Sequence, residues 1–415
     1  MHSGTISPHD WGLAPAPIAP DWELRGLSIS AAALEQRIQA NTYQWLPLQL
    51  DAETGAYYGH YRAPDRYREP PQTANLIASW QLMAAFDRYH DPHLLERATR
   101  ALEFYYRHFV VSHPMSIVNG GARDGSATHE VWTKYSAEFV VGALGLFRRT
   151  GNLLWLERAT QSGRFLVQAT RHGFAPRYFL DRGRWAGLES GWDSWGRVIA
   201  ACLGLAQATG DARWQELALR WGEHALAIQA QDGCFYLIDQ EYYNTDLAAD
   251  ELRGLAFLYE ITGEERFLAA ARRFADWHLA HQRPDGAWAM TQDHEGNLVT
   301  PTVGPGDMPN IGIALLRLHH LTRHGAYLDA ALRAFSYSLS KQVLPGSAEP
   351  YADDPCVQWG FWSWDPYYDY TVSADQATHH IRGMMFLLDY LSSLNTRDGA
   401  PSTPCSPLPA GERGA

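Results

Sequence analysis

Residues 198–227 read VIAACLGLAQATGDARWQELALRWGEHALA, and this stretch contains the pattern that decides the fold. Its first part, 198–206, is apolar on nearly every side, which is typical of a helix that is buried on every side. Its last part, 214–227, places apolar residues at helical spacing on one face. The short polar turn 209–211 (TGD) separates the two. The stretch therefore predicts a helical hairpin in which a buried inner helix precedes an amphipathic outer one.

The same pattern occurs five times, about 60 residues apart, and a repeat at a fixed period sets the architecture of a chain. The other four polar turns are at 89–92, 150–152, 262–264 and 323–325. The pattern predicts inner helices over residues 74–88, 134–149, 195–208, 247–261, 309–322 and 374–393. It predicts outer helices over residues 92–109, 153–169, 212–229, 264–281 and 326–342, and a further amphipathic helix precedes them at 30–45.

Six inner and six outer helices predict an all-α, single-domain (α/α)6 toroid, in which the N-terminal helix completes the last pair. An open superhelix of stacked helix pairs is the alternative for the same pattern. We expect residues 1–29 to form an irregular N-terminal segment, residues 30–395 to form the barrel, and residues 396–415 to form a disordered tail.

Composition excludes several classes of function. The formal net charge of −12 argues against a nucleic-acid partner. No apolar run approaches the length of a membrane span, and the N-terminus lacks the pattern of a signal peptide, so we expect a cytoplasmic protein. The cysteines form no CxxC pair, so we expect no metal site and no cofactor; they are Cys202, Cys234, Cys356 and Cys405. The oligomeric state is not indicated.

The connections between hairpins are long, and in a closed ring they all lie on one face. They span residues 110–133, 170–194, 230–246, 282–308 and 343–373. Long loops in a compact domain are usually functional, and these contain an excess of aromatic and ionisable residues. The N-termini of the inner helices also point to this face. Aromatic platforms together with carboxylates suit a small carbohydrate, whereas aromatic residues that only cover the barrel are the structural alternative.

Cleavage of a glycosidic bond needs two carboxyl groups, one of them an acid with a raised pKa. The candidates lie at or near the starts of inner helices. Asp193 precedes the third inner helix, although it also suits a helix cap. Glu138 and Asp250 lie in very apolar helices, where a carboxylate is costly unless it is paired or used. His379 is a candidate acid or base at the start of the last inner helix.

A wider set of residues at this face is expected to contact the substrate. It contains polar and charged side chains next to the inner-helix starts and aromatic side chains in the loops. Its members are His129, Trp132, Trp192, Arg197, Tyr243, Asp307, Trp362, Trp364, Tyr368, Asp375 and His380. Structural alternatives remain open for two of them, because Arg197 could simply pair with a buried carboxylate and Asp307, just ahead of Pro309, suits a helix start.

Residues 30–393 resemble the (α/α)6-barrel sugar enzymes. The segment GWDSWGRVIAACLGLAQATGD (191–211) is similar to one in the unsaturated glucuronyl and rhamnogalacturonyl hydrolases. Those enzymes place an aspartate at the start of the second inner helix, where this chain has residues 132–135 (WTKY). The ending THHIRGMMFLLDYL (378–391) is similar to the N-acylglucosamine 2-epimerase superfamily. The mid-chain histidine of that superfamily has no counterpart, since the corresponding helix opens with Asp246 and Asp250.

The sequence thus predicts an enzyme, first a glycoside hydrolase that acts on a small oligosaccharide, which could contain a uronic acid. In that hypothesis Asp193 and a second acid, Asp250 or Glu138, transfer protons. An epimerase or lyase that uses His379 or His380 is the alternative. A terpenoid cyclase, which the pattern QRPDGAW (282–288) would suit, and a non-enzymatic helical scaffold are the remaining classes.

Overall fold

The computed structural model of the chain describes residues 24, 26–125, 129–187, 195–237 and 242–398. Within these, six inner helices form a ring: α2 (Ala74–Tyr89), α4 (Thr133–Thr150), α6 (Trp195–Thr209), α8 (Thr245–Thr262), α10 (Asp307–Thr322) and α12 (Ala374–Asp398). Six outer helices surround them: α1 (Ala31–Ala40), α3 (Pro92–Phe109), α5 (Leu153–Arg171), α7 (Ala212–Ile228), α9 (Glu265–His281) and α11 (Gly325–Ser340).

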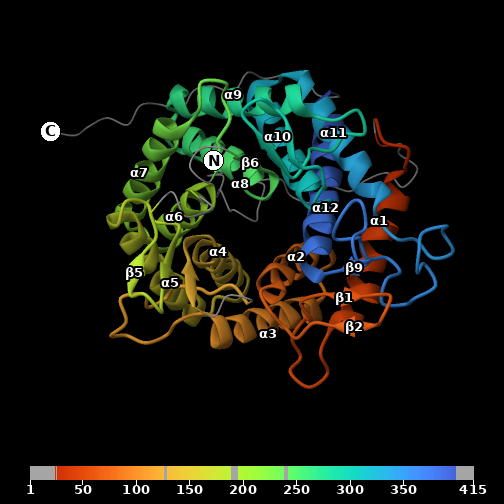
Figure 1. Cartoon of the computed structure of the whole chain (residues 1–415), viewed down its shortest axis with the longest axis horizontal. Helices are drawn as coiled ribbons and strands as arrows, with labels where there is room; N and C mark the ends of the chain where they lie inside the picture. The colour runs from red at the N-terminus through yellow and green to blue at the C-terminus, as the bar shows by residue number, and fades with distance from the viewer. Residues whose placement is uncertain (1–23, 25, 126–128, 188–194, 238–241, 399–415) are drawn as a thin grey trace.

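The ring is closed. Each inner helix packs against the next, and α12 packs against α2, as Figure 1 shows in a view down the barrel. The helix α1 lies beside α12 and completes the sixth pair. The predicted (α/α)6 toroid is therefore confirmed, and the open superhelix is wrong because α12 and α2 would then be far apart.

Each short turn between an inner and an outer helix contains one residue in the left-handed backbone region. Glycine occupies this position in three turns, and His90 (φ 56°) and Arg323 (φ 59°) occupy it in the other two. The backbone N–H of this residue donates a hydrogen bond to a carbonyl of the last helical turn, while its left-handed conformation turns the chain away from the helix. In the next helix, Asp91, Asn152 or Asp211 accepts a hydrogen bond from the backbone N–H two residues on. This local chemistry explains why the repeat is visible in the sequence.

The long connections are less irregular than the sequence predicts, because they contain short antiparallel strands. One sheet has the order β2-β1-β9, with β1 (Tyr61–Arg62), β2 (Tyr67–Arg68) and β9 (Thr371–Val372). The second, β3-β4-β5, contains Glu130–Trp132, Arg177–Phe179 and Arg184–Trp185, and the third, β6-β7-β8, contains Tyr242–Asn244, Thr291–Asp293 and Leu298–Thr300. Each sheet fixes the chain just before an inner helix begins.

Helix boundaries agree with the prediction except at the two ends. The N-terminal helix ends at Ala40 and continues as a π-helical turn, Asn41–Trp45, and a 3₁₀ turn, Leu46–Gln49. The last helix, α12, continues to Asp398, past the expected domain boundary at 395. The residues before 24 and after 398 lie outside the described part of the chain.

The inner helices α6 and α8 are in backbone contact. A Cβ atom added to Gly196 would lie 2.1 Å from the carbonyl oxygen of Asp250, and one added to Gly254 would lie 2.8 Å from the Cα atom of Gly196. Ordinary carbon contacts are longer than this, so only glycine fits at this crossing. The crossing lies directly beneath the ionisable groups described below.

We predict that Gly196→Ala lowers the free energy of unfolding by about 3 kcal/mol, because backbone atoms cannot yield to the added methyl group. The matched control is Gly325→Ala in the first turn of α11, where an added Cβ has no neighbour within 4 Å. The control should keep or slightly raise stability in urea denaturation, since alanine favours the helix. Equal stability of the two variants would contradict the close crossing.

Candidate active site

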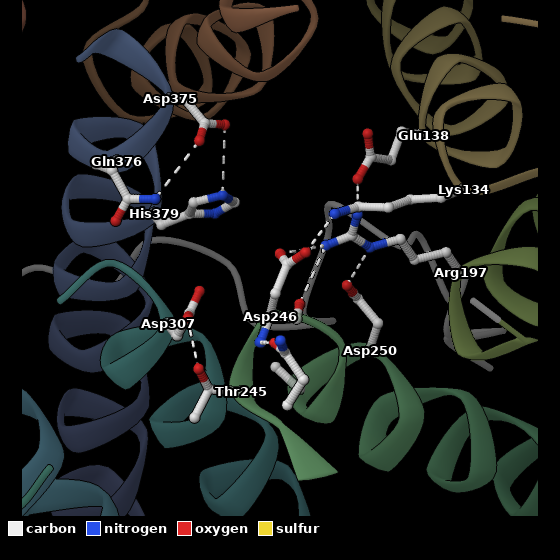
Figure 2. Close-up of polar contacts among 12 residues, drawn as sticks. Lys134, Glu138, Arg197, Thr245, Asp246, Asp250, Asp307, Asp375, Gln376 and His379 are labelled. Carbon is white, nitrogen blue, oxygen red and sulfur yellow. Dashed lines mark hydrogen bonds and ion pairs between the residues drawn. The ribbon is translucent and has the colours of Figure 1, made fainter. Parts of the chain in front are cut away.

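Five inner helices bring ionisable side chains together at the end of the barrel where the long connections lie. Each of these five helices contributes one ionisable side chain from its first turn: Lys134 (α4), Arg197 (α6), Asp246 (α8), Asp307 (α10) and Asp375 (α12). Figure 2 shows the side chains of Asp246, Asp307 and His379 directed from three helices toward a common region. The dipoles of these helices favour negative charge here. This cluster is the candidate active site.

Asp307 is a buried carboxyl group at the first position of α10. Its Oδ2 atom accepts a hydrogen bond of 2.7 Å from the hydroxyl of Thr245. Burial, together with the nearby negative charge of Asp246, raises the pKa of Asp307 to about 7. The side chain makes no capping hydrogen bond, since Gly306 is the capping residue of α10. Asp307 can therefore hold a proton near neutral pH.

Asp246, in contrast to Asp307, tends to lose its proton. Its carboxylate forms an ion pair with the ammonium group of Lys134, and one oxygen lies 3.6 Å from the guanidinium of Arg197. Burial opposes ionisation, but the charges of Lys134 and Arg197 outweigh it and hold the pKa of Asp246 below its usual range. Asn244 caps α8 by accepting from the backbone N–H of Asp246, which leaves the carboxylate directed at Lys134.

His379 lies one turn along α12 from Asp375. Its Nε2 atom is 3.7 Å from a carboxylate oxygen of Asp375, and its Nδ1 atom has no hydrogen-bond partner among the described residues. Burial lowers the pKa of His379 to about 4, although the charge of Asp375 acts in the opposite direction. The imidazole is therefore neutral at pH 7 and can accept a proton.

The carboxylates of Glu138 and Asp250 lie deeper. They follow Lys134 and Asp246 by four residues on the same helices, which is about 6 Å along the helix axis. Both form ion pairs with Arg197, and Asp250 also pairs with Arg253. Burial alone would raise the pKa of Asp250, but the two guanidinium groups hold it well below its usual range. Asp250 is thus ionised and fixed in place, which suits a structural ion pair better than a proton donor.

A small cavity of about 30 Å³ lies among these deeper groups. Glu138, Arg197, Asp250, Arg253 and Arg382 supply its charged lining, and Trp80 and Phe257 are among its apolar lining. Its volume suits about one water molecule. It is too small to hold a sugar ring, so chemistry on a sugar is favoured at the level of Asp246, Asp307 and His379.

A larger pocket, of about 260 Å³, adjoins the cluster at Asp375 and Gln376. It lies between the N-termini of α2 and α12 and the sheet β2-β1-β9. Trp364, one of the expected substrate-binding residues, contributes to its wall. Tyr368 is 63% exposed near it, with its ring centroid 6.4 Å from that of Trp364.

Other residues of the expected set lie elsewhere. His129 is exposed, and Trp132 lies at the rim with the guanidinium of Arg177 4.6 Å above its ring. Trp362 is buried, and its indole nitrogen is 3.3 Å from Glu349. Asp193, an expected catalytic acid, and Trp192 are outside the described residues.

Tyr243 and His380 face the outer helices rather than the barrel axis. The hydroxyl of Tyr243 lies 2.8 Å from a ring nitrogen of His278 in α9. The Nδ1 atom of His380 lies 2.6 Å from the hydroxyl of Ser338 in α11, and its ring stacks on Phe361 with a centroid distance of 3.9 Å. Neither lines either pocket. Their positions explain both residues as parts of the packing between helices, so the structure does not support the prediction that they contact substrate.

Sequence reasoning did not select Asp246 or Lys134 as site residues. The available signal was a lysine in the first turn of a helix whose next turns are almost entirely apolar (residues 137–147). A buried ammonium group requires a partner, but that partner lies 112 residues away in the chain. Only the closed ring identifies it.

The described residues contain no group of three or more His, Cys, Asp or Glu side chains arranged to hold a metal ion. None of their helices is both long enough and apolar enough to cross a membrane.

Comparison with known proteins identifies the fold. No protein-family model matches the chain, and no curated protein is similar to it in sequence. Among solved structures, it is similar to a D-mannose isomerase, with a TM-score of 0.69 and 12% identity over 86% of this chain and 97% of the other. It is also similar to cellobiose 2-epimerase from Bacillus thermoamylovorans, with a TM-score of 0.68 and 13% identity over 87% and 99% of the two chains.

An unsaturated glucuronyl hydrolase specific for heparin is a further structural neighbour, with a TM-score of 0.60 and 13% identity over 88% of this chain and 98% of the other. All three are (α/α)6-barrel enzymes, and both groups that the sequence resembles are represented among the neighbours. Identities this low establish the fold alone.

We predict that Arg197→Met lowers the free energy of unfolding by about 3–5 kcal/mol at pH 7, because Glu138 loses its ion pair in a buried site and Asp250 loses one of two. The pKa of Asp250 should rise without Arg197, so the deficit should be smaller at pH 5 than at pH 8. Urea denaturation at the two pH values measures both effects.

The matched control is Arg213→Met, which removes an equally charged side chain from the pair with Asp211. The Arg213 side chain is 86% exposed, so its ion pair contributes little. The control should stay within about 0.5 kcal/mol of the parent protein. An equal loss of free energy of unfolding in both variants would show that the buried ion pairs stabilise the protein no more than an exposed one does.

Proposed function

We propose that this protein is a carbohydrate-processing enzyme that performs acid/base catalysis with Asp307 and Asp246, and that it hydrolyses a glycosidic bond. One observation carries the proposal: two neighbouring carboxyl groups are driven to opposite protonation states. Asp307 tends to keep a proton, and Asp246 tends to lose one. Such a pair provides an acid and a base at the same pH.

The proposed reaction uses both groups in one step. The glycosidic carbon–oxygen bond breaks as Asp307 gives its proton to the leaving oxygen. A water molecule forms the new bond to the anomeric carbon and gives a proton to Asp246. Charge is conserved, and Lys134 remains beside Asp246 to stabilise its ionised form before the reaction. The ion-paired Glu138 and Asp250 hold Arg197 in place beneath the reacting groups.

The structural neighbours support the substrate class. They include a D-mannose isomerase, a cellobiose 2-epimerase and a glucuronyl hydrolase, which share this barrel and act on sugars or glycosides. The pocket beside Asp375 contains several neutral polar side chains and a tryptophan, which suits sugar hydroxyls and an apolar sugar face. A small carbohydrate is therefore the proposed substrate.

A sugar epimerase or isomerase is the second candidate, and His379 favours it. A neutral imidazole whose Nδ1 atom has no partner among the described residues can take a proton from a sugar carbon next to a carbonyl group. The proton then returns to the same carbon from the other side, or to the neighbouring carbon. This reaction needs no water and releases no new reducing end.

Solvent deuterium separates the two reactions. Incubation with a panel of mono- and disaccharides in D2O, followed by NMR, should show a new reducing end without deuterium on carbon if the protein is a hydrolase. Deuterium at C2 of a recovered sugar would replace the hydrolase proposal with the epimerase or isomerase. No conversion of any sugar would contradict the whole class.

We predict that Asp307→Asn lowers kcat by about 10²–10⁴-fold, because the amide cannot donate a proton to the leaving oxygen. In the parent protein kcat/KM should fall as pH rises through about 7, where Asp307 loses its proton. It should also fall at acidic pH, where Asp246 gains one. Asp353→Asn, at an exposed loop position, is the control and should retain full activity.

We also predict that Asp307→Asn stabilises the protein at pH 8. The pKa of Asp307 is higher in the folded state than in the unfolded state, so the folded protein favours the proton. The resulting stability is present below about pH 4 and is lost as pH rises through 7. An amide is neutral at every pH, so the variant should gain about 2–5 °C in Tm at pH 8 and little at pH 4. A lower Tm at pH 8 would show that the carboxyl is a structural group.

A further inference from the structure

The pocket beside Asp375 has an unusual balance of charge. Three carboxylate side chains line it, Glu69, Asp369 and Asp375, and the described lining contains no lysine or arginine. Its one basic group is His60, whose Nδ1 atom lies 2.8 Å from Glu69. The formal charge of the lining is thus −3 with a neutral imidazole and −2 with a protonated one. A ligand that carries a positive charge is favoured there.

The rest of the lining suits a sugar. Six neutral polar side chains surround the carboxylates: Gln72, Thr73, Ser363, Thr371, Ser373 and Gln376. Ser363 is only 6% exposed, and its hydroxyl has no hydrogen-bond partner among the described residues. A buried hydroxyl without a partner is costly, and a ligand hydroxyl would satisfy it. Trp364 adds an aromatic surface at one wall.

The pocket is connected to the proposed acid. The side-chain oxygen of Gln376 accepts a hydrogen bond of 3.0 Å from the backbone N–H of Gly306, the residue before Asp307. Asp375 lies 3.7 Å from His379 on the other side. A hydrogen bond thus links the pocket lining to the residue next to Asp307, the group proposed to protonate the leaving oxygen.

We propose that this pocket is the subsite for the leaving sugar and that it selects an amino sugar with a free ammonium group. The inference rests on the proposed function and refines its substrate class. Ammonium and carboxylate groups form short, charge-assisted hydrogen bonds, and the three carboxylates offer six acceptor oxygens. A uronate places a negative charge beside the same carboxylates, so like-charge repulsion disfavours it. The uronic-acid hypothesis drawn from the sequence is therefore not favoured at this subsite.

Binding of three matched probes tests the inference. Methyl glucosaminide, methyl glucoside and methyl glucuronide differ in one substituent each, and calorimetric titration at low salt gives their Kd values. The glucosaminide should bind about tenfold more tightly than the glucoside, and the glucuronide should bind most weakly. N-acetylation of the glucosaminide removes its charge and should remove the advantage. Added salt screens the charges and should therefore reduce the difference in Kd between the glucosaminide and the glucoside.

Two variants test whether the preference for the glucosaminide arises from the carboxylates of this pocket. Asp369→Asn and Glu69→Gln keep the shape of the pocket but remove one charge each, so each should weaken the glucosaminide several-fold and leave the glucoside unchanged. Asp353→Asn, outside the pocket lining, is the control and should change neither Kd. The Tm of each variant shows whether it remains folded.

The outcomes separate the inference from the proposed function. Equal affinity for the glucosaminide and the glucoside, tighter binding of the glucuronide, or no binding of any probe would overturn the amino-sugar subsite. None of these results bears on catalysis, which the conversion of the sugar panel measures independently. If amino sugars bind as expected but no sugar is converted, the subsite stands and the proposed reaction fails.

Discussion

The contact between α12 and α2 is the constraint on which the rest of the structure depends, because it closes the ring. Once the ring is closed, every inner helix packs against its two inner neighbours and against outer helices. An ionisable group inside such a wall is costly unless it is paired. Lys134 and Asp246 therefore lie in the first turns of their helices, near the long connections, and Glu138 and Asp250 are held in ion pairs just beneath them.

The candidate site follows from this arrangement in two layers. In the deeper layer, Arg197 binds Glu138 and Asp250, and Arg253 also binds Asp250, so two positive and two negative charges balance and stay fixed. In the upper layer, Lys134 forms an ion pair with Asp246. Asp307 is then left with a hydroxyl partner rather than a cation. An uneven supply of cations among carboxyl groups is what separates their pKa values.

The fold could be predicted from the sequence because its signals are local. The turn residues and the fully apolar inner helices recur in each hairpin, and each can be recognised within about 20 residues. The short strands could not be predicted, because two or three residues are too few to show an alternating pattern, and some pairings, such as that of β1 with β9, join segments far apart in the chain.

The candidate site was harder to predict, because the role of each ionisable side chain depends on which side chain of another helix it contacts. Glu138 and Asp250 were selected as carboxylates in apolar helices, which was a sound reason to expect a partner or a function. Arg197, which the sequence already offered as a partner for a buried carboxylate, lies on a third helix and binds both, and Asp250 also binds Arg253 on its own helix. Asp307 was expected only to contact substrate, since its raised pKa depends on burial within the closed ring and on the charge of Asp246, 61 residues earlier in the chain. No local pattern contains that information.

The glycine crossing of α6 and α8 has a consequence for how such a barrel can evolve. At Gly196 and Gly254 the two helices meet without side chains between them, so the spacing there is fixed by backbone atoms. A hairpin copied from elsewhere in the ring would bring larger residues to this crossing and would push its neighbours apart. The six hairpins therefore share an architecture but are not interchangeable modules, because each close contact of this kind ties a glycine to one position in the ring.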